Sequence, residues 1–188
     1  MISDYGFGFM MRNTTLDQTI KAKQVFESKM AKHNIKVKAY RVDNGRFADL
    51  GFNKEVNKCN QIITYCGVGA HGQNGNVERY IGKVTKRSRS MLLHAKRFWP
   101  EAITHMLWPF AVSEAINVLN YLLVDKTGKT PIQKLTATTT HILLQNQHAW
   151  GCPVHVLESK VQALSKGLPK WEPGARIEVC LGRSTLHA

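Results

Sequence analysis

The spacing of hydrophobic residues predicts helices and extended segments in alternation along the chain. Apolar residues near helical spacing indicate helices over residues 16–31, 49–58, 76–97 and 108–123. Short or alternating apolar runs indicate extended segments over residues 2–12, 35–42, 61–66, 152–157 and 176–181. Together these patterns predict an α/β core, with helices packed on a short sheet, followed by a small β-rich tail.

Turn residues separate these segments and suggest how the chain is organised. Asp43-Asn44-Gly45 follows one predicted strand, and residues 67–75 hold four glycines, which indicates a loop with unusual backbone freedom. A change from helical patterns to polar, turn-rich sequence near residue 126 divides the chain. We therefore expect a core over residues 1–125 and a C-terminal extension with short strands over residues 126–188.

The charge balance narrows the class of partner. The chain has 26 Lys and Arg against 13 Asp and Glu, a formal net charge of +13. A compact protein with this excess attracts polyanions, because neutralised phosphates release counterions. A basic surface without a specific partner is the plainer explanation. No apolar run reaches the roughly 18 residues of a membrane span, so we expect no membrane partner.

The cysteines and the chain start indicate an intracellular protein. No secretory signal precedes the four cysteines and none forms a C-x-x-C pair, so reduced thiols are expected. Cys59, Cys66 and His71 do not match the spacing of a common zinc finger, and buried or incidental thiols are the favoured interpretation. The four tryptophans are expected in the core or at an interface rather than as base-stacking platforms.

Two acidic residues stand at positions suited to phosphate or metal chemistry. Asp43 lies where a strand ends, and ligands of open α/β sheets gather at carboxyl ends of strands. Glu78 lies in the first turn of the long helix, where the helix dipole favours a carboxylate. Taken singly, each has a plainer interpretation, since Asp43 can make an Asx-turn and Glu78 can cap its helix.

The long helix has a predicted core face and a basic face. Five residues near heptad spacing are expected to face the core: Val77, Ile81, Val84, Met91 and Ala95. Gly82 leaves a gap beside Glu78 that could admit a nucleic-acid end. Five cations follow the same helix: Arg79, Lys83, Lys86, Arg87 and Arg89. Because no acid occurs from Arg79 to Pro100, contact with phosphates is favoured over a merely solvated face.

The two acidic positions also share a sequence setting. Val42–Phe47 reads Val-Asp-Asn-Gly-Arg-Phe, and Ala70–Arg79 reads Ala-His-Gly-Gln-Asn-Gly-Asn-Val-Glu-Arg, with 34 residues between the two acids. These segments resemble the second half of the catalytic triad in copia-type retrotransposon integrases. Arg89–Leu92, Thr130-Pro131 and Trp150–Val154 also resemble family segments, so the likeness covers nearly the whole chain.

The resemblance implies a ribonuclease-H-like fold and two-metal phosphoryl transfer. In such a site three carboxylates hold two Mg²⁺ (or Mn²⁺) ions about 4 Å apart. Asp43 would be the second acid and metal ligand, and Glu78 the third. Gln73 and Asn74 would contact DNA ends, whereas His71 is expected to be a solvent-exposed loop residue. The implied partner is DNA, in the nucleus where integration occurs, with a homo-oligomer left open.

The first acid of the triad has no counterpart at the expected position. In the family it ends the first strand, ahead of the segment that residues 2–9 resemble, and Asp4 aligns with a structural position. We therefore expect a core that lacks its first strand, binds metal weakly and binds DNA without strand transfer. The family's N-terminal zinc-binding segment is absent, Gly72 stands where a histidine is common, and Arg46 stands where glutamate is common.

Two other hypotheses remain open. The chain could be an active nuclease or integrase whose third carboxylate comes from Asp4 or from another chain. Alternatively, it could be a non-catalytic module that binds nucleic acid or protein through a basic fold. Metal binding separates the first alternative from the main hypothesis, because two carboxylates hold one ion weakly where three hold two.

Overall fold

The structure is a computed structural model of the 188-residue chain that describes residues 3–43, 45–67, 75–138, 148–159, 161, 171 and 173–182. The chain forms two compact units. Unit 1 comprises Met1–Lys83 and Pro131–Thr138, and unit 2 comprises Val84–Thr130 and Thr139–Ala188. The expected boundary between residues 125 and 126 stays a prediction.

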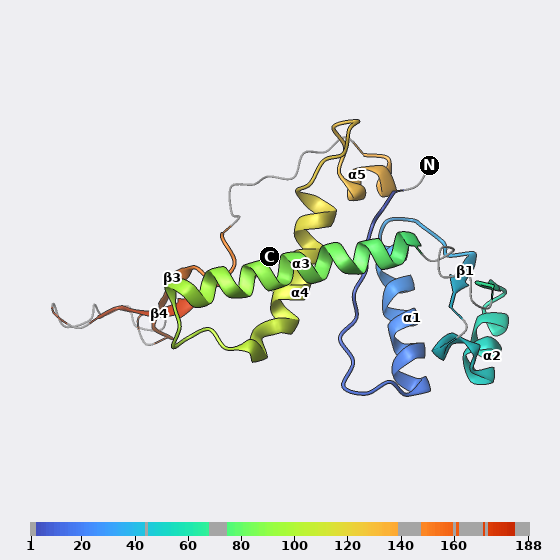
Figure 1. Ribbon diagram of the computed structural model, residues 1–188, viewed down its shortest axis with the longest axis horizontal. Helices are drawn as coiled ribbons and strands as arrows, with labels where there is room; N and C mark the ends of the chain where they lie inside the picture. Colours follow the sequence, from blue (N-terminus) through green and yellow to red (C-terminus); the bar gives the residue numbers. More distant parts are fainter. Residues whose placement is uncertain are drawn as a thin grey trace. The chain divides into compact units, whose positions relative to one another are not determined.

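Unit 1 combines helices with a short parallel sheet. Its elements are α1 (Leu16–Ala31), β1 (Ala39–Val42), the 3-10 helix η1 (Arg46–Ala48), α2 (Leu50–Lys58), β2 (Ile62–Tyr65), the first turns of α3 (Gly75–Phe98), and α5 (Pro131–Thr136). Figure 1 shows α1, β1 and α2 side by side. The prediction of a helix over residues 16–31 is confirmed at both ends, and α2 and α3 begin and end within one residue of their predicted bounds.

Local chemistry explains where these helices begin and end. The Asp49 carboxylate accepts a hydrogen bond from the Gly51 backbone N–H at 2.7 Å, so α2 begins directly after a capping aspartate. After α1, Asn34 has a φ of 60°, a left-handed conformation that asparagine tolerates and that stops a helix. The chain can then turn back along α1 toward β1.

The sheet of unit 1 is a parallel pair. β1 pairs with β2 in a register that joins Ala39 to Ile62 and Val42 to Tyr65. The Cys66 N–H continues this ladder by donating to the Val42 carbonyl at 2.9 Å. Because parallel strands need a crossover, α2 lies between them in sequence, and both strands end at the same edge.

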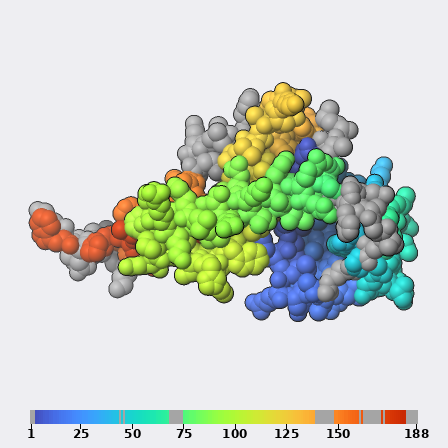
Figure 2. Space-filling view, viewed as in Figure 1, coloured from blue at the N-terminus to red at the C-terminus, as the bar shows by residue number. Residues whose placement is uncertain are grey.

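Aromatic packing under the sheet forms the core of unit 1. Phe52 of α2 is 2% exposed, and its ring lies 5.3 Å from that of Phe47 and 6.5 Å from that of Tyr40. Val56 is fully buried on the same helix face as Phe52. The space-filling view shows α1 and the segment from β1 to α2 packed against each other (Figure 2). This packing fixes the β1–β2 edge.

Unit 2 is built on the rest of α3. It contains η3 (His105–Leu107), α4 (Trp108–Tyr121) and an antiparallel pair of β3 (Pro153–Leu157) with β4 (Ala175–Val179). Four buried residues form its core: Ala95, Ile103, Ala111 and Trp150. Gly151 has a φ of 80°, and a Cβ there would collide with the Ala95 side chain, so only glycine lets this segment approach α3.

Several sequence-based expectations were wrong in the described residues. Residues 3–12 belong to no strand, because neither sheet of the described residues pairs with them. The polar segment after residue 126, expected to hold only turns, contains α5, which begins at Pro131 and buries Ile132. Of the tryptophans, which were expected in the core or at an interface, Trp150 is a core residue, and the exposed Trp99, Trp108 and Trp171 leave the interface alternative as a prediction.

Two expectations about the chain's chemistry can be compared with the structure. None of the four cysteines is joined in a disulfide in the structure. Within the described ranges, no helix combines the length and the apolar character needed to cross a membrane.

Candidate functional site

Asp43 lies at the carboxyl end of β1, as the sequence predicted. It follows Val42, the last residue of the strand and a buried one, and its own side chain is exposed. A Cβ placed on Gly45 would lie 3.6 Å from Asp43 Oδ1, so the carboxylate lies over the Gly45 backbone. Strand pairing therefore presents this acid at an edge of the sheet that is open to solvent.

Glu78 lies in the first turn of α3, also as predicted, and its side chain is exposed. α3 follows β2 along the chain, and β2 ends at the same edge of the parallel pair as β1. Both acids therefore belong to segments that leave from the carboxyl ends of neighbouring strands. The predicted DNA-contact residues Gln73 and Asn74, and His71, lie outside the described residues.

The two acids do not form a complete metal site by themselves. Among the residues that the structure describes, no group of three His, Cys, Asp or Glu side chains could hold a metal ion. Asp4, the alternative third ligand, has an exposed side chain and a φ of 54°. It does not join Asp43 and Glu78 in such a group. The donor chemistry suits Mg²⁺, which prefers carboxylate oxygens, but the donor number does not suit a pair of ions.

The N-terminal segment nevertheless packs against the first turns of α3. The Tyr80 ring covers Gly6 so closely that a Cβ at Gly6 would collide with it. Burial, together with nearby Tyr5, raises the pKa of Tyr80 to about 12. The Tyr80 hydroxyl is buried and has no hydrogen-bond partner in the described part of the chain. This contact holds the extended segment two residues along the helix from Glu78.

Arg79 is directed toward the start of its own helix. Its Nε donates to the Gly75 carbonyl at 3.1 Å, and its guanidinium also donates to Asn76 Oδ1. A cation at a helix N-terminus opposes the dipole, and these two acceptors offset that cost locally. The guanidinium therefore lies over the first turn, next in sequence to Glu78.

The other cations of α3 remain available to an anion. Lys83, Lys86 and Arg89 are exposed, and Arg87 is half-buried. None of these four forms an ion pair in the described residues. Across the helix, a Cβ on Gly82 would meet no atom within 4 Å, so the predicted gap is open space. The basic residues thus form an exposed, unneutralised row.

The predicted core face of α3 is only partly correct. Val84 and Ala95 are buried at 8% and 2% exposure, and Met91 packs against the core of unit 2. Val77 and Ile81 are instead 53% and 58% exposed. The apolar spacing is right, but nothing in the described residues covers its first two positions.

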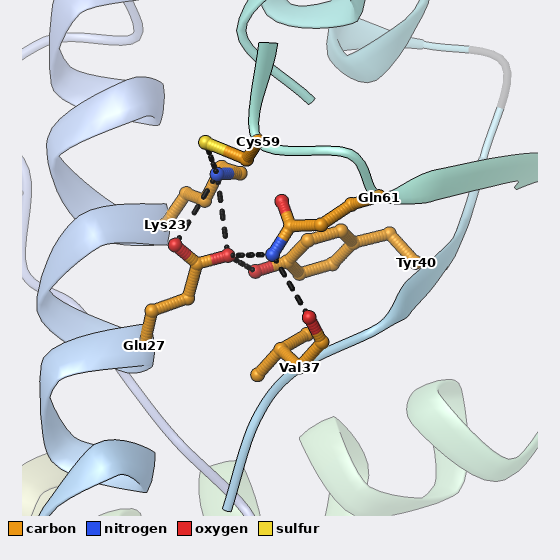
Figure 3. Close-up of polar contacts among 6 residues, drawn as sticks. All are labelled: Lys23, Glu27, Val37, Tyr40, Cys59 and Gln61. Atoms are coloured by element: carbon orange, nitrogen blue, oxygen red, sulfur yellow. Dashed lines mark hydrogen bonds and ion pairs between the residues drawn. The ribbon is translucent and has the colours of Figure 1, made fainter. Parts of the chain in front are cut away.

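A partly buried polar network ties the start of the β1–β2 pair to α1 (Figure 3). Glu27 of α1 accepts hydrogen bonds from the Tyr40 hydroxyl and from Gln61 Nε2, both at 2.6 Å. Lys23, one turn earlier, pairs with Glu27 at 3.2 Å, and its side chain is only 2% exposed. Gln61 also donates to the Val37 carbonyl at 3.0 Å. Tyr40 lies in β1 and Gln61 precedes β2, so one carboxylate anchors both strands.

The electrostatics of this network favour an ionised Glu27. Burial alone would raise its pKa, but the hydrogen bonds from Tyr40, Gln61 and Lys23 and the Lys23 charge outweigh it and lower the pKa. The pKa of Tyr40 is raised by burial and by donation to Glu27. The charged pair is thus satisfied in place, which is the condition for tolerating buried charge.

Sequence reasoning missed these network residues. Lys23 and Glu27 are four residues apart on α1, a spacing that usually marks an exposed surface pair worth little. The signal that could have found them is the polar Gln61 directly before an apolar strand. Its side-chain amide is partly buried and therefore needs hydrogen-bond partners.

Comparison with known proteins finds similar solved structures but no match in sequence. In sequence, no family model and no curated protein matches the chain. The HTLV-2 integrase catalytic core domain, in complex with magnesium in a trimeric form, aligns with TM-score 0.49 and 23% identity over 64% of this chain and 70% of that chain. A chain of a simian T-cell lymphotropic virus intasome with PP2A regulatory subunit B56 gamma aligns with TM-score 0.53 and 18% identity over 68% of this chain.

The intasome likeness concerns the fold. This chain has an α/β fold similar to that of part of the matched intasome chain, and the α/β class agrees with the prediction from the sequence. It spans 42% of the length of the intasome chain that it matches.

Proposed function

We propose that this chain is the DNA-binding catalytic core of a copia-type retrotransposon integrase, with Asp43 and Glu78 as its metal ligands. The observation that carries the proposal is the parallel β1–β2 edge. It presents Asp43 at the end of β1, and the segment after β2 leads to Glu78 in the first turn of α3. The intasome-like fold supports it.

The proposed metal chemistry is limited by the number of acids. Two carboxylates with waters can hold one Mg²⁺ or Mn²⁺ weakly, and such an ion would polarise a phosphoryl oxygen. Phosphoryl transfer with two ions needs a further carboxylate beside them. We therefore expect this chain to bind DNA and one metal ion and to lack strand transfer on its own.

The proposed DNA surface is the basic row of α3. Lys83, Lys86 and Arg89 are exposed cations without an ion pair in the described residues, so phosphates can neutralise them without breaking internal contacts. Arg79, Arg87, Gln73 and Asn74 belong to the same proposed surface. Such contacts position a duplex without reading its sequence. We further propose that the protein acts in the nucleus, as integration requires, and that it self-associates.

Salt-dependent binding tests the proposed DNA surface. We expect the triple variant Lys83→Ala/Lys86→Ala/Arg89→Ala to bind duplex DNA about tenfold or more weakly at 0.1 M salt, and the slope of log K against log [salt] to fall by about 3. Fluorescence anisotropy with a labelled blunt-ended duplex measures both quantities.

The matched control for this experiment removes the same charge elsewhere. Its three substitutions fall on exposed lysines of unit 1: Lys21→Ala, Lys32→Ala and Lys38→Ala. An equal loss in the control would show that net charge alone drives binding. Unchanged DNA binding by the α3 variant would contradict the proposed DNA surface. It would favour the alternative of a non-catalytic module that binds its partner through another surface.

Calorimetric titration with Mg²⁺ or Mn²⁺ tests the acids. We expect one weak site that Asp43→Asn or Glu78→Gln removes and that the exposed control acids, changed as Asp17→Asn and Glu101→Gln, leave intact. Two tight ions, or strand transfer of a DNA end that Asp4→Ala abolishes, would show that the chain is an active enzyme instead. If the heat of metal binding is the same in the unchanged chain and in the Asp43→Asn and Glu78→Gln variants, these two residues are not the metal ligands.

A further inference from the structure

Two cysteines of unit 2 lie opposite each other at one end of the β3–β4 pair. The antiparallel register joins Pro153 to Val179. One step further along the same register places Cys152 opposite Cys180. The Cys180 N–H donates to the Cys152 carbonyl at 2.9 Å, which shows that the pairing reaches these residues.

This juxtaposition matches what a disulfide requires. Directly opposed residues of antiparallel strands have Cα atoms about 4.5 to 5.5 Å apart, and disulfides span Cα separations of about 4.4 to 6.8 Å. Both residues are partly exposed, so a small oxidant can reach them. The backbone pairing therefore brings the two cysteines to the separation that a cross-strand disulfide spans.

The cysteine pair adjoins the core of unit 2. Gly151, directly before Cys152, donates to the Cys180 carbonyl at 2.7 Å, and Trp150 is a core residue. Leu181, directly after Cys180, packs against the same core. A covalent link at this point would therefore join two segments that cover α3, rather than two free loops.

We propose that Cys152 and Cys180 are a redox modification site, which forms a reversible cross-strand disulfide on reaction with a low-molecular-weight disulfide. One thiolate attacks the small disulfide and releases one small thiol. The second cysteine then attacks the mixed disulfide and releases the other small thiol. The two protein thiols lose two electrons and two protons, one S–S bond forms, and the small disulfide is reduced.

The proposal is independent of DNA binding. Burial, with Cys180 beside it, raises the pKa of the Cys152 thiol, so this thiol is no strong nucleophile by itself. The pair reacts because the strand pairing holds the second cysteine opposite the first, where it can resolve the mixed disulfide. Cys59 is exposed and provides an internal comparison, because it has no opposed cysteine in the described residues.

Peptide mapping of the full chain tests the proposal. After incubation with oxidised glutathione, we expect a Cys152–Cys180 peptide lacking two hydrogens, its reversal by dithiothreitol, and glutathione retained only at exposed Cys59. Cys152→Ser and Cys180→Ser should each lose this peptide, whereas Cys59→Ser should keep it. Glutathione retained on Cys152 or Cys180, or linkage to another cysteine, would overturn the assignment.

A thermal melt of the unchanged sequence tests the structural role without any substitution. The oxidised form should melt at least about 4 °C higher than the reduced form, because the bond restricts the unfolded chain. An equal or lower melting temperature, with the link present in the map, would show that the bond strains the native hairpin. That result would overturn the proposal that the native strand pairing accommodates the Cys152–Cys180 disulfide.

Discussion

The two parts of α3 carry apolar residues at the same helical spacing but expose them very differently. In the first part, Val77 and Ile81 are more than half exposed, whereas Val84 and Ala95 in the second part are nearly covered. The difference teaches that periodicity identifies residues that share a face, while burial depends on what packs there. The exposed part carries Glu78 and Arg79, and the covered part supports unit 2.

The largest expected effect lies in the covered region. Ile103 is 1% exposed in the core that Ala95 helps to form. Ile103→Ala should lower the free energy of unfolding by about 4 kcal/mol, through lost burial and a cavity. Ile81→Ala, at an exposed position, should change it by less than about 0.5 kcal/mol. Urea denaturation measures both, and similar losses would contradict the contrast between the two parts of α3.

The glycine that approaches Ala95 gives the next effect. Gly151→Ala should cost about 3 kcal/mol, since it adds both a strained positive φ and a collision with the helix. Gly128 has a similar φ of 72° but no atom within 4 Å of an added Cβ. Gly128→Ala should therefore cost only about 1 kcal/mol. If the two variants melt alike, contact with α3 contributes nothing beyond backbone strain.

The Glu27 network should give a smaller, pH-dependent effect. Glu27→Gln leaves the buried Lys23 ammonium without its counter-charge and should cost about 2 kcal/mol at neutral pH. Because folding lowers the Glu27 pKa, its contribution is present above the ordinary value of 4.5 and is lost as the pH falls through the folded value.

The unfolding free energies of the unchanged chain and of Glu27→Gln should therefore converge below about pH 4. Denaturation at several pH values gives the two curves. A constant difference down to pH 3 would mean that the Glu27 charge is not what stabilises the network. Asp17→Asn, an exposed acid on the same helix, is the control for general effects of removing a negative charge.

The smallest expected effect concerns the exposed start of α3. The buried Tyr80 hydroxyl has no hydrogen-bond partner among the described residues. Tyr80→Phe therefore removes a polar group that contributes no hydrogen bond to the folded state. Stability should change by less than about 0.5 kcal/mol or rise slightly. Tyr80→Ala, which removes the ring over Gly6, should cost several times more. A clear loss in the phenylalanine variant would reveal a partner for the hydroxyl.

Sequence alone predicted the helices well because their signals are local. Asp49 caps α2, Pro109 lies in the first turn of α4, and the spacing of apolar residues in α1 gives both its ends. α5 was still missed, because its single buried residue, Ile132, gives no periodic pattern. The predicted strand over residues 2–12 failed for a different reason, since a strand exists only if another strand pairs with it.

The places of Asp43 and Glu78 within their elements were predicted from the sequence, but the Glu27 network that anchors β1 and β2 was not. The turn after residue 42 and the loop before α3 are visible in the sequence, and they located Asp43 and Glu78. The Glu27 network was not visible, because its partners lie on α1, β1 and the start of β2 and are brought together only by folding. Whether the two acids bind a metal stays a prediction.

The parallel pairing of β1 with β2 also constrains the order in which unit 1 folds. Its partners are 23 residues apart, as in Ala39 with Ile62, so no tight turn can start the ladder. α1 and α2 can form from local contacts. We expect the β1–β2 ladder to form after them, because it joins residues far apart in the sequence. In pulse-labelled hydrogen exchange we expect helix amides to be protected before those of β2. The edge that presents Asp43 would then be a late product of folding, and an intermediate with complete helices would still lack it.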